Sequence, residues 1–194
     1  MVKSYFTTTP QPVTVSHSPC CRQLARTGYN GRGLFETIGY DANMNDNFFA
    51  FQYHALKPLK QWGLGNIIGG TILTLIPGFW RHFGLQALSW GAIDWLLAIA
   101  GRRQALLKAE DLVAGDLDES AAHAAAERFR TILLINAGLD LLYIASGLWL
   151  FRTAGERTDR RGMGAGIFVQ GLFLLLFDSI LAAEINRRWI PPSP

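Results

Sequence analysis

Long apolar stretches separated by short polar segments dominate the chain from residue 61 onward. Residues 61–80 contain no charged side chain, and the windows 82–101, 131–151 and 162–183 contain one aspartate each. A helix of about 20 apolar residues crosses a hydrocarbon core of ~30 Å. The pattern predicts an all-α fold, a bundle of four transmembrane helices over about 61–80, 82–101, 131–151 and 162–184. The alternative is a soluble all-helical protein with unusually apolar helices.

The connection between the second and third windows, residues 102–130, is rich in helix formers. Gly115 is a natural helix stop, and Asp116 and Asp118 are suitable N-caps for the Ala-rich stretch that follows. We therefore expect these two helices to extend beyond the bilayer as a cytoplasmic helical hairpin. The hairpin is either a surface on which a partner docks or a solvated loop that happens to be helical.

The N-terminal part has a different composition. Residues 1–46 are polar and contain prolines and glycines, so they cannot bury a core of their own. They are predicted to form an extended or flexible arm, which is disordered or lies on another surface. The rest, 47–190, forms the bundle. It opens with "NFFAFQYHALK", in which Asn47 is expected to cap a helix whose aromatic side chains rest at the membrane interface before Pro58.

Charge supports a membrane protein and gives it an orientation. Only 17% of the residues are charged, below the usual quarter or so of a soluble domain, and 49% are hydrophobic. The side that holds both termini carries nine basic residues near the membrane: Lys57, Lys60, Arg102, Arg103, Lys108, Arg128, Arg130, Arg187 and Arg188. The other side carries five: Arg81, Arg152, Arg157, Arg160 and Arg161. The excess predicts cytoplasmic termini in a multi-pass protein of a bacterial cytoplasmic (inner) membrane.

Motifs for catalysis, cofactors and metals are absent from the sequence. The four histidines fall outside the predicted hydrocarbon core, which argues against a haem held by a mid-membrane histidine. Cys20 and Cys21 are adjacent and cannot form a zinc site by themselves. There is no basic stripe with interleaved aromatics for nucleic acid. We expect no enzymatic activity, cofactor, metal or nucleic-acid partner, and we interpret Arg81 and His82 as a polar hinge that contacts lipid headgroups.

Small residues recur at helical spacing in three of the four windows. Gly65 and Gly69 form a GxxxG pair, as do Gly162 and Gly166, while Gly84, Gly91 and Ala98 are seven residues apart. In lipid such stripes usually allow helix backbones to approach closely. These glycines are therefore predicted to be helix-packing positions rather than space for a ligand.

Polar residues inside the apolar windows are the main candidate site. A carboxylate at the bilayer centre costs about 2.5–3.5 kcal/mol on insertion scales. By depth along the helices, five polar groups from all four windows fall in the cytoplasmic half of the bilayer: Asn66, Asp94, Asn136, Asp140 and Asp178. They are predicted to form one cluster that faces the bundle axis. It is either a hydrogen-bonded network that fixes helix register or a site that binds protons or cations.

Several of these segments resemble a bacterial family of four-span membrane proteins known only as a domain of unknown function. The resemblance rests on "WGLGNIIGG" at 62–70, on the histidine-containing loop at His82 and on "WGAID" at 90–94. It is strongest in "NAGLDLLYIASGLWL" at 136–150 and "GIFVQGLFLLLFD" at 166–178. It covers roughly residues 45–186. The resemblance implies the fold and no activity, and Asp94 stands where the family usually has Asn.

Two functions remain open from the sequence. The first is a non-catalytic accessory or structural subunit of a larger membrane complex, bound through the N-terminal arm and the 102–130 hairpin as well as the bilayer. The alternative is a small proton- or ion-coupled transporter or binding protein that uses Asp94, Asp140 and Asp178.

Overall fold

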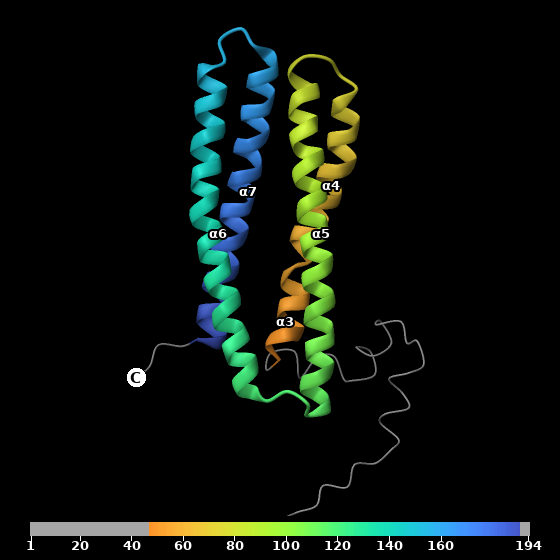
Figure 1. Ribbon diagram of the computed structural model, residues 1–194, viewed down its shortest axis with the longest axis vertical. Coiled ribbons are helices and arrows are strands. Elements are labelled where there is room, and N and C mark those ends of the chain that lie inside the picture. The colour runs from red at the N-terminus through yellow and green to blue at the C-terminus, as the bar shows by residue number, and fades with distance from the viewer. Residues whose placement is uncertain (1–46, 191–194) are drawn as a thin grey trace, which may run out of the picture. The chain divides into compact units, whose positions relative to one another are not determined.

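The computed structural model describes residues 47–190, and these form helices joined by short turns (Figure 1). In chain order the helices are α3 (Phe48–Ala55), α4 (Lys57–Thr74), α5 (Phe79–Ala114), α6 (Glu119–Thr153) and α7 (Thr158–Trp189). The all-α prediction is confirmed for this part of the chain. The predicted arm over 1–46 lies outside the described residues.

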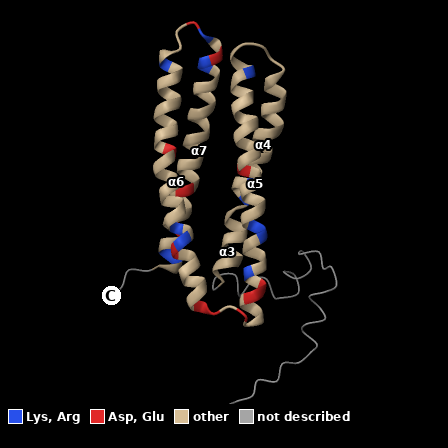
Figure 2. Cartoon of the chain, viewed as in Figure 1, with Lys and Arg blue, Asp and Glu red and all other residues tan. Residues whose placement is uncertain are grey.

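Three of the helices, α5, α6 and α7, are long and apolar enough to cross a membrane. They contain 36, 35 and 32 residues, and their most apolar windows have mean hydropathies of 1.3, 1.6 and 2.0. Lys and Arg gather toward the ends of the long helices, while the middle of the molecule is largely free of them (Figure 2). This distribution is the one expected of segments in contact with hydrocarbon.

The predicted first span over 61–80 was wrong in its bounds. Helix α4 has 18 residues, begins at Lys57 and ends at Thr74. Pro77 disfavours helical geometry at the residue before it, and Gly78 has a positive φ of 78° that few other residues adopt. The chain therefore turns over residues 75–78, and α5 starts at Phe79.

The connection over 102–130 is helical almost throughout, as predicted. Helix α5 continues to Ala114, where Gly115 ends it with a left-handed φ of 78°. Asp118 caps α6, since its carboxylate accepts a 2.9 Å hydrogen bond from the Ala121 backbone N–H. The placement of this hairpin relative to a membrane stays a prediction.

Helices α4 to α7 form two helical hairpins, α4–α5 and α6–α7, which are joined chiefly where α5 packs against α7. In both hairpins, the two helices approach most closely at glycine residues. A Cβ added at Gly70 would lie 2.8 Å from the carbonyl oxygen of Gly84, and one at Gly147 would lie 2.8 Å from that of Gly164. The backbones are thus in direct contact, which is how helices associate where no hydrophobic force acts between them. The helices of the predicted four-helix bundle thus pack as two hairpins, and whether all four cross a membrane stays a prediction.

The glycine pairs of the sequence divide into packed and exposed ones. Gly162 and Gly166 lie against α5, where an added Cβ would meet the backbone of Phe79 and the side chain of Gln86. Gly65 and Gly69 have no atom within 4 Å of an added Cβ, so their predicted packing role within this chain was wrong. The reason is rotation of α4, which turns Gly63 and Gly70 toward α5 instead (Gly63 meets Gly91).

Helix α3 contributes Phe48 and Phe49 to the core, so the prediction that its aromatics rest at the membrane interface was wrong for these two rings and stays a prediction for Phe51 and Tyr53. Asn47 caps it as expected, accepting hydrogen bonds from the N–H groups of Phe49 and Ala50. Phe48 and Phe49 are each 1% exposed, and they pack with residues of the three long helices: Ala109, Ala122, Ala126, Leu133, Leu181, Ala182 and Ile185. The physical reason is that small and apolar side chains of α5, α6 and α7 surround these two rings and exclude water from them.

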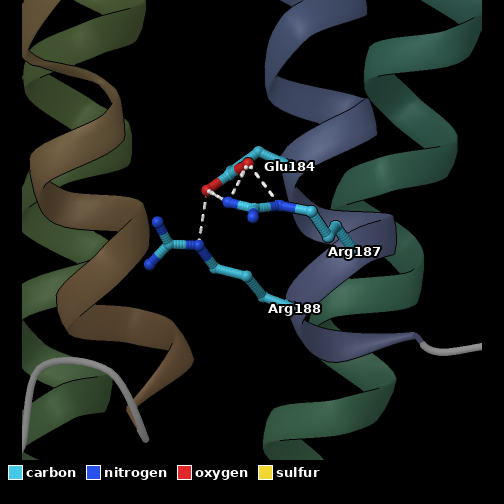
Figure 3. A network of polar contacts seen from close by, with 3 residues as sticks. All are labelled: Glu184, Arg187 and Arg188. Atoms are coloured by element: carbon cyan, nitrogen blue, oxygen red, sulfur yellow. Dashed lines mark hydrogen bonds and ion pairs between the residues drawn. The ribbon is translucent and has the colours of Figure 1, made fainter.

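Polar and aromatic contacts fix α3 on its neighbours. Arg102 of α5 donates a 2.7 Å hydrogen bond to the Tyr53 carbonyl, and its guanidinium lies 3.9 Å from the Tyr53 ring centroid. On α7, Glu184 accepts hydrogen bonds from both Arg187 and Arg188 (Figure 3). Arg188 reaches toward α3, where it lies 5.4 Å from the Phe51 ring centroid. Helix α3 therefore ties the end of α7 to α5.

Candidate functional site

Three carboxyl groups from three helices are buried together where the hairpins meet. Asp94 of α5 and Asp140 of α6 are each 3% exposed, and Asp178 of α7 is 5% exposed. Asp140 interacts electrostatically with Asp94, and Asp178 interacts with both of them. The three predicted aspartates thus form one cluster in the interior.

Gln170, which was not among the predicted site residues, is also a member of this site. Its side-chain N–H donates a 3.0 Å hydrogen bond to Oδ2 of Asp94, and its Oε1 accepts a 3.0 Å hydrogen bond from the Trp62 indole N–H. Gln170 is 3% exposed. The resulting chain Trp62–Gln170–Asp94 connects α4, α7 and α5. The signal was present in the sequence, because Gln170 and Asp178 are the two strongly polar side chains of the apolar window 162–183.

Aromatic rings flank the cluster. The Trp62 ring is stacked on Phe173 with centroids 4.0 Å apart and an angle of 8° between the planes. Trp90 and Tyr143, four residues before Asp94 and three after Asp140, meet edge to face at 5.1 Å. Each of these ring pairs joins a helix of one hairpin to a helix of the other.

The two asparagines predicted for the cluster lie elsewhere. Asn66 donates a 3.0 Å hydrogen bond to the Trp62 carbonyl of its own helix, and its Cβ packs against Gly91. Asn136 is exposed, although it is only four residues from the buried Asp140. Four residues advance a helix by about 400°, so the two side chains differ in direction by about 40°, enough to turn Asn136 outward. Its assignment to the cluster was therefore wrong.

Charge compensation is lacking at the cluster. Within residues 47–190, the ion pairs lie near helix ends and involve His123, Arg157, Arg187 and Arg188 with nearby acidic residues, none of them in the cluster. One carboxylate oxygen, Oδ2 of Asp140, is buried without a hydrogen-bond partner in the structure. Such a group costs about 1–3 kcal/mol, and more when it is charged. The site is thus short of positive charge and of hydrogen-bond donors.

Arg81 and His82 lie at the start of α5. Arg81 is exposed, and His82 is partly buried with its Nδ1 3.0 Å from the Gly78 carbonyl oxygen. A carbonyl can only accept, so this contact assigns a proton to Nδ1. The ring stabilises the turn between α4 and α5. A headgroup contact for the pair stays a prediction.

Comparison with known proteins places the chain in a family. A family model described as a family of unknown function, DUF6992, matches residues 58–179. The match spans the three aspartates together with Trp62 and Gln170. Searches of curated proteins and of solved structures found no match.

The resemblance to an uncharacterised family is confirmed, while the bacterial origin and the four spans that it implied stay predictions. On the family match, which covers more than half of the chain, this protein belongs to DUF6992, a family of unknown function.

Proposed function

We propose that this chain is a non-catalytic, multi-pass membrane protein that binds protons at the cluster of Asp94, Asp140 and Asp178. The observation that carries the proposal is the burial of three carboxyl groups, from three apolar helices, without a cationic partner. Three negative charges held together in an apolar interior repel one another and lose their hydration. Binding a proton removes both costs, because it neutralises one group.

Hydrogen bonding supports the same assignment. A protonated carboxyl group gains a donor, which a buried carboxylate lacks. Oδ2 of Asp140 is the buried oxygen without a partner, so a proton there allows Asp140 to donate to a neighbouring carboxylate. Asp94 already accepts from Gln170 and is the natural member to stay ionised. In the described part of the chain no three potential ligands are placed to hold a metal ion, which favours protons over a metal cation.

Proton flux in reconstituted vesicles tests whether this binding serves transport. The protein in liposomes with a pH-sensitive dye inside is compared with Asp140→Asn, which keeps shape but cannot release a proton. Asp159→Asn, at the exposed start of α7, is the matched control. Transport predicts flux above that of empty liposomes in wild type and in Asp159→Asn, and its loss in Asp140→Asn. Wild-type vesicles that match empty liposomes would reduce the cluster to a structural element.

A second candidate function is an accessory subunit of a larger membrane complex. The observation that favours it is Asn136, an exposed amide near the middle of the apolar stretch of α6. In lipid this amide has no hydrogen-bond partner, and a polar group on another chain would provide one. The matched control is Ser146 of the same helix, whose hydroxyl already donates to the Tyr143 carbonyl.

Purification in mild detergent tests this second candidate. An accessory subunit elutes with a stable complex, and Asn136→Leu releases it while Ser146→Ala does not. If wild type elutes alone, or if deletion of residues 1–45 and Asn136→Leu both leave the complex intact, this candidate is excluded.

We also propose that α4 crosses the membrane with the three longer helices and that both termini are cytoplasmic. The turns at 75–78 and 154–157 lie at one end of the long helices, and the turn at 115–118 lies at the other (Figure 1). The excess of Lys and Arg is at the second end, which supports a cytoplasmic location for it. A cysteine at Gly115 that is labelled from outside intact cells would contradict this orientation.

A further inference from the structure

We infer that a pocket between the protruding ends of α5 and α6 binds the headgroup of an anionic phospholipid. The pocket has a volume of about 390 Å³. Its apolar wall comes from Phe49 of α3 with Leu117, Phe129 and Ile132, and its polar residues include Lys108 and Arg128. None of these groups belongs to the aspartate cluster. The inference depends on α5 and α6 lying in a bilayer and is independent of proton binding.

Uncompensated positive charge is the first argument. Among the residues of the described chain that line the pocket, two are cationic and none is acidic. Lys108 contacts the Phe49 ring, with Nζ 5.6 Å from the ring centroid, and has no carboxylate partner. Glu127, the neighbour of Arg128 in sequence, contacts His123 instead. A phosphodiester would supply the missing negative charge.

Depth is the second argument, and it favours a lipid over a soluble anion. Ile132 stands at the start of the apolar window of α6 and is 53% exposed. Lys108 is seven residues past Gly101, the end of the apolar window of α5, which is about 10 Å along the helix. The headgroup layer is roughly 5–8 Å thick on each side, and a lysine side chain can reach back into it. Basic pockets between helix ends at this level bind anionic headgroups, while Phe129 and Ile132 offer apolar surface to an acyl chain.

Lipid affinity of the full chain in detergent tests the inference. Native mass spectrometry compares phosphatidylglycerol with phosphatidylcholine of the same acyl chains. The variant Lys108→Gln/Arg128→Gln is matched by Arg103→Gln/Arg130→Gln, which removes the same charge from the same helices outside the pocket lining. The expected result is tighter binding of phosphatidylglycerol, about 30-fold weaker in the pocket variant and unchanged in the control. Equal losses in both variants, or equal binding of the two lipids, would overturn the proposal.

Two further experiments identify the molecule that occupies the pocket. Inorganic phosphate that displaces the lipid at equal concentration would show a site for a free anion and would overturn the lipid assignment. A photo-reactive residue at Ala124, in the pocket wall, should form adducts with lipid. Adducts with peptides from residues 1–46 would instead make the N-terminal arm the occupant and would also overturn it. If the double variant fails to fold, Arg128→Gln alone is used, with an expected loss of about fivefold.

Discussion

The side-chain amide of Gln170 donates a 3.0 Å hydrogen bond to Oδ2 of Asp94 and so joins α7 to α5 in the interior of the molecule. The same amide accepts from Trp62 of α4, at 3.0 Å. One neutral side chain thus orients a carboxylate and an indole on two other helices. Gln170 therefore fixes the orientation of Asp94, one of the three aspartates of the proposed proton-binding cluster.

Replacing Gln170 with Leu should weaken the junction of the two hairpins. The change leaves the Asp94 carboxylate and the Trp62 indole without their partners. Hydrogen bonds between membrane helices contribute about 0.6 kcal/mol each on average, so the loss should be about 1 kcal/mol in the free energy of unfolding. Unfolding by sodium dodecyl sulfate in mixed micelles measures it. Trp62→Phe, which removes one of the two bonds and keeps a ring on Phe173, should cost about half as much. Equal stability of wild type and Gln170→Leu would show that these bonds do not join the hairpins.

Gly147→Ala should destabilise the α6–α7 hairpin. The added Cβ would lie 2.6 Å from the Phe168 backbone nitrogen and 2.8 Å from the Gly164 carbonyl oxygen, so the helices must separate. Overpacking of this kind costs about 1–3 kcal/mol. Gly138→Ala in the same helix is the control, because nothing lies within 4 Å of its Cβ and alanine favours a helix by up to about 1 kcal/mol. Thermal unfolding in detergent should give a lower Tm for Gly147→Ala than for wild type and no fall for Gly138→Ala. A similar fall for both variants would contradict the packing described.

Phe48→Ala should release α3 from the ends of the long helices. Phe48 is 1% exposed and meets Phe129 and Trp189 edge to face, with centroids 6.3 and 5.7 Å apart. Removing a buried phenyl ring costs about 3–5 kcal/mol. Hydrogen exchange of residues 48–55 should therefore become much faster, while Leu107→Ala, at a residue 51% exposed, should leave it unchanged. Unaltered protection in Phe48→Ala would mean that the ring does not hold α3 in place.

His54 should make the stability of the α3 region depend on pH. Burial lowers the pKa of His54, and the charges of Arg102 and Lys57 lower it further. Between the folded pKa and the unfolded value of about 6.5, the unfolded chain binds more protons, so stability rises with pH. The contribution of His54 is complete above about pH 6.5 and is lost as the pH falls through the folded pKa. Tm measured across this range should vary less with pH in His54→Gln than in wild type, and identical slopes would contradict the assignment.

The sequence determines which segments are helical more clearly than which face of each helix turns inward. Gly65 and Gly69, four residues apart, look as suited to packing as Gly63 and Gly70, seven apart, yet only the second pair meets α5. Periodicity identifies a face, and tertiary contacts choose between faces. The same applies to Asn136 and Asp140, whose difference in direction of about 40° separates an exposed side chain from a buried one.

The members of the site that could be predicted from the sequence are the charged ones. Asp94, Asp140 and Asp178 stand out because each is the single charged residue of an apolar window. Gln170 is strongly polar within its apolar window but carries no charge, and Trp62 is one of six tryptophans, so the hydrogen bonds between helices are what assign both to the site. The burial of Phe48 and Phe49 could not be predicted from the sequence either, because it also depends on contacts between helices. An aromatic helix of eight residues is compatible with an anchor at a membrane interface and with a core element. Only its contacts with the long helices distinguish the two.

Infrared spectroscopy of carboxyl C=O stretching tests the central claim, proton binding by the aspartate cluster, most directly. Protonated and ionised carboxyl groups absorb at separate frequencies, and exposed acidic residues are ionised at neutral pH. Proton binding by the cluster predicts a protonated carboxyl band at pH 7 that is lost or reduced in Asp140→Asn and retained in the control Asp159→Asn. Wild-type protein without such a band, or a band that Asp140→Asn leaves unchanged, would contradict it.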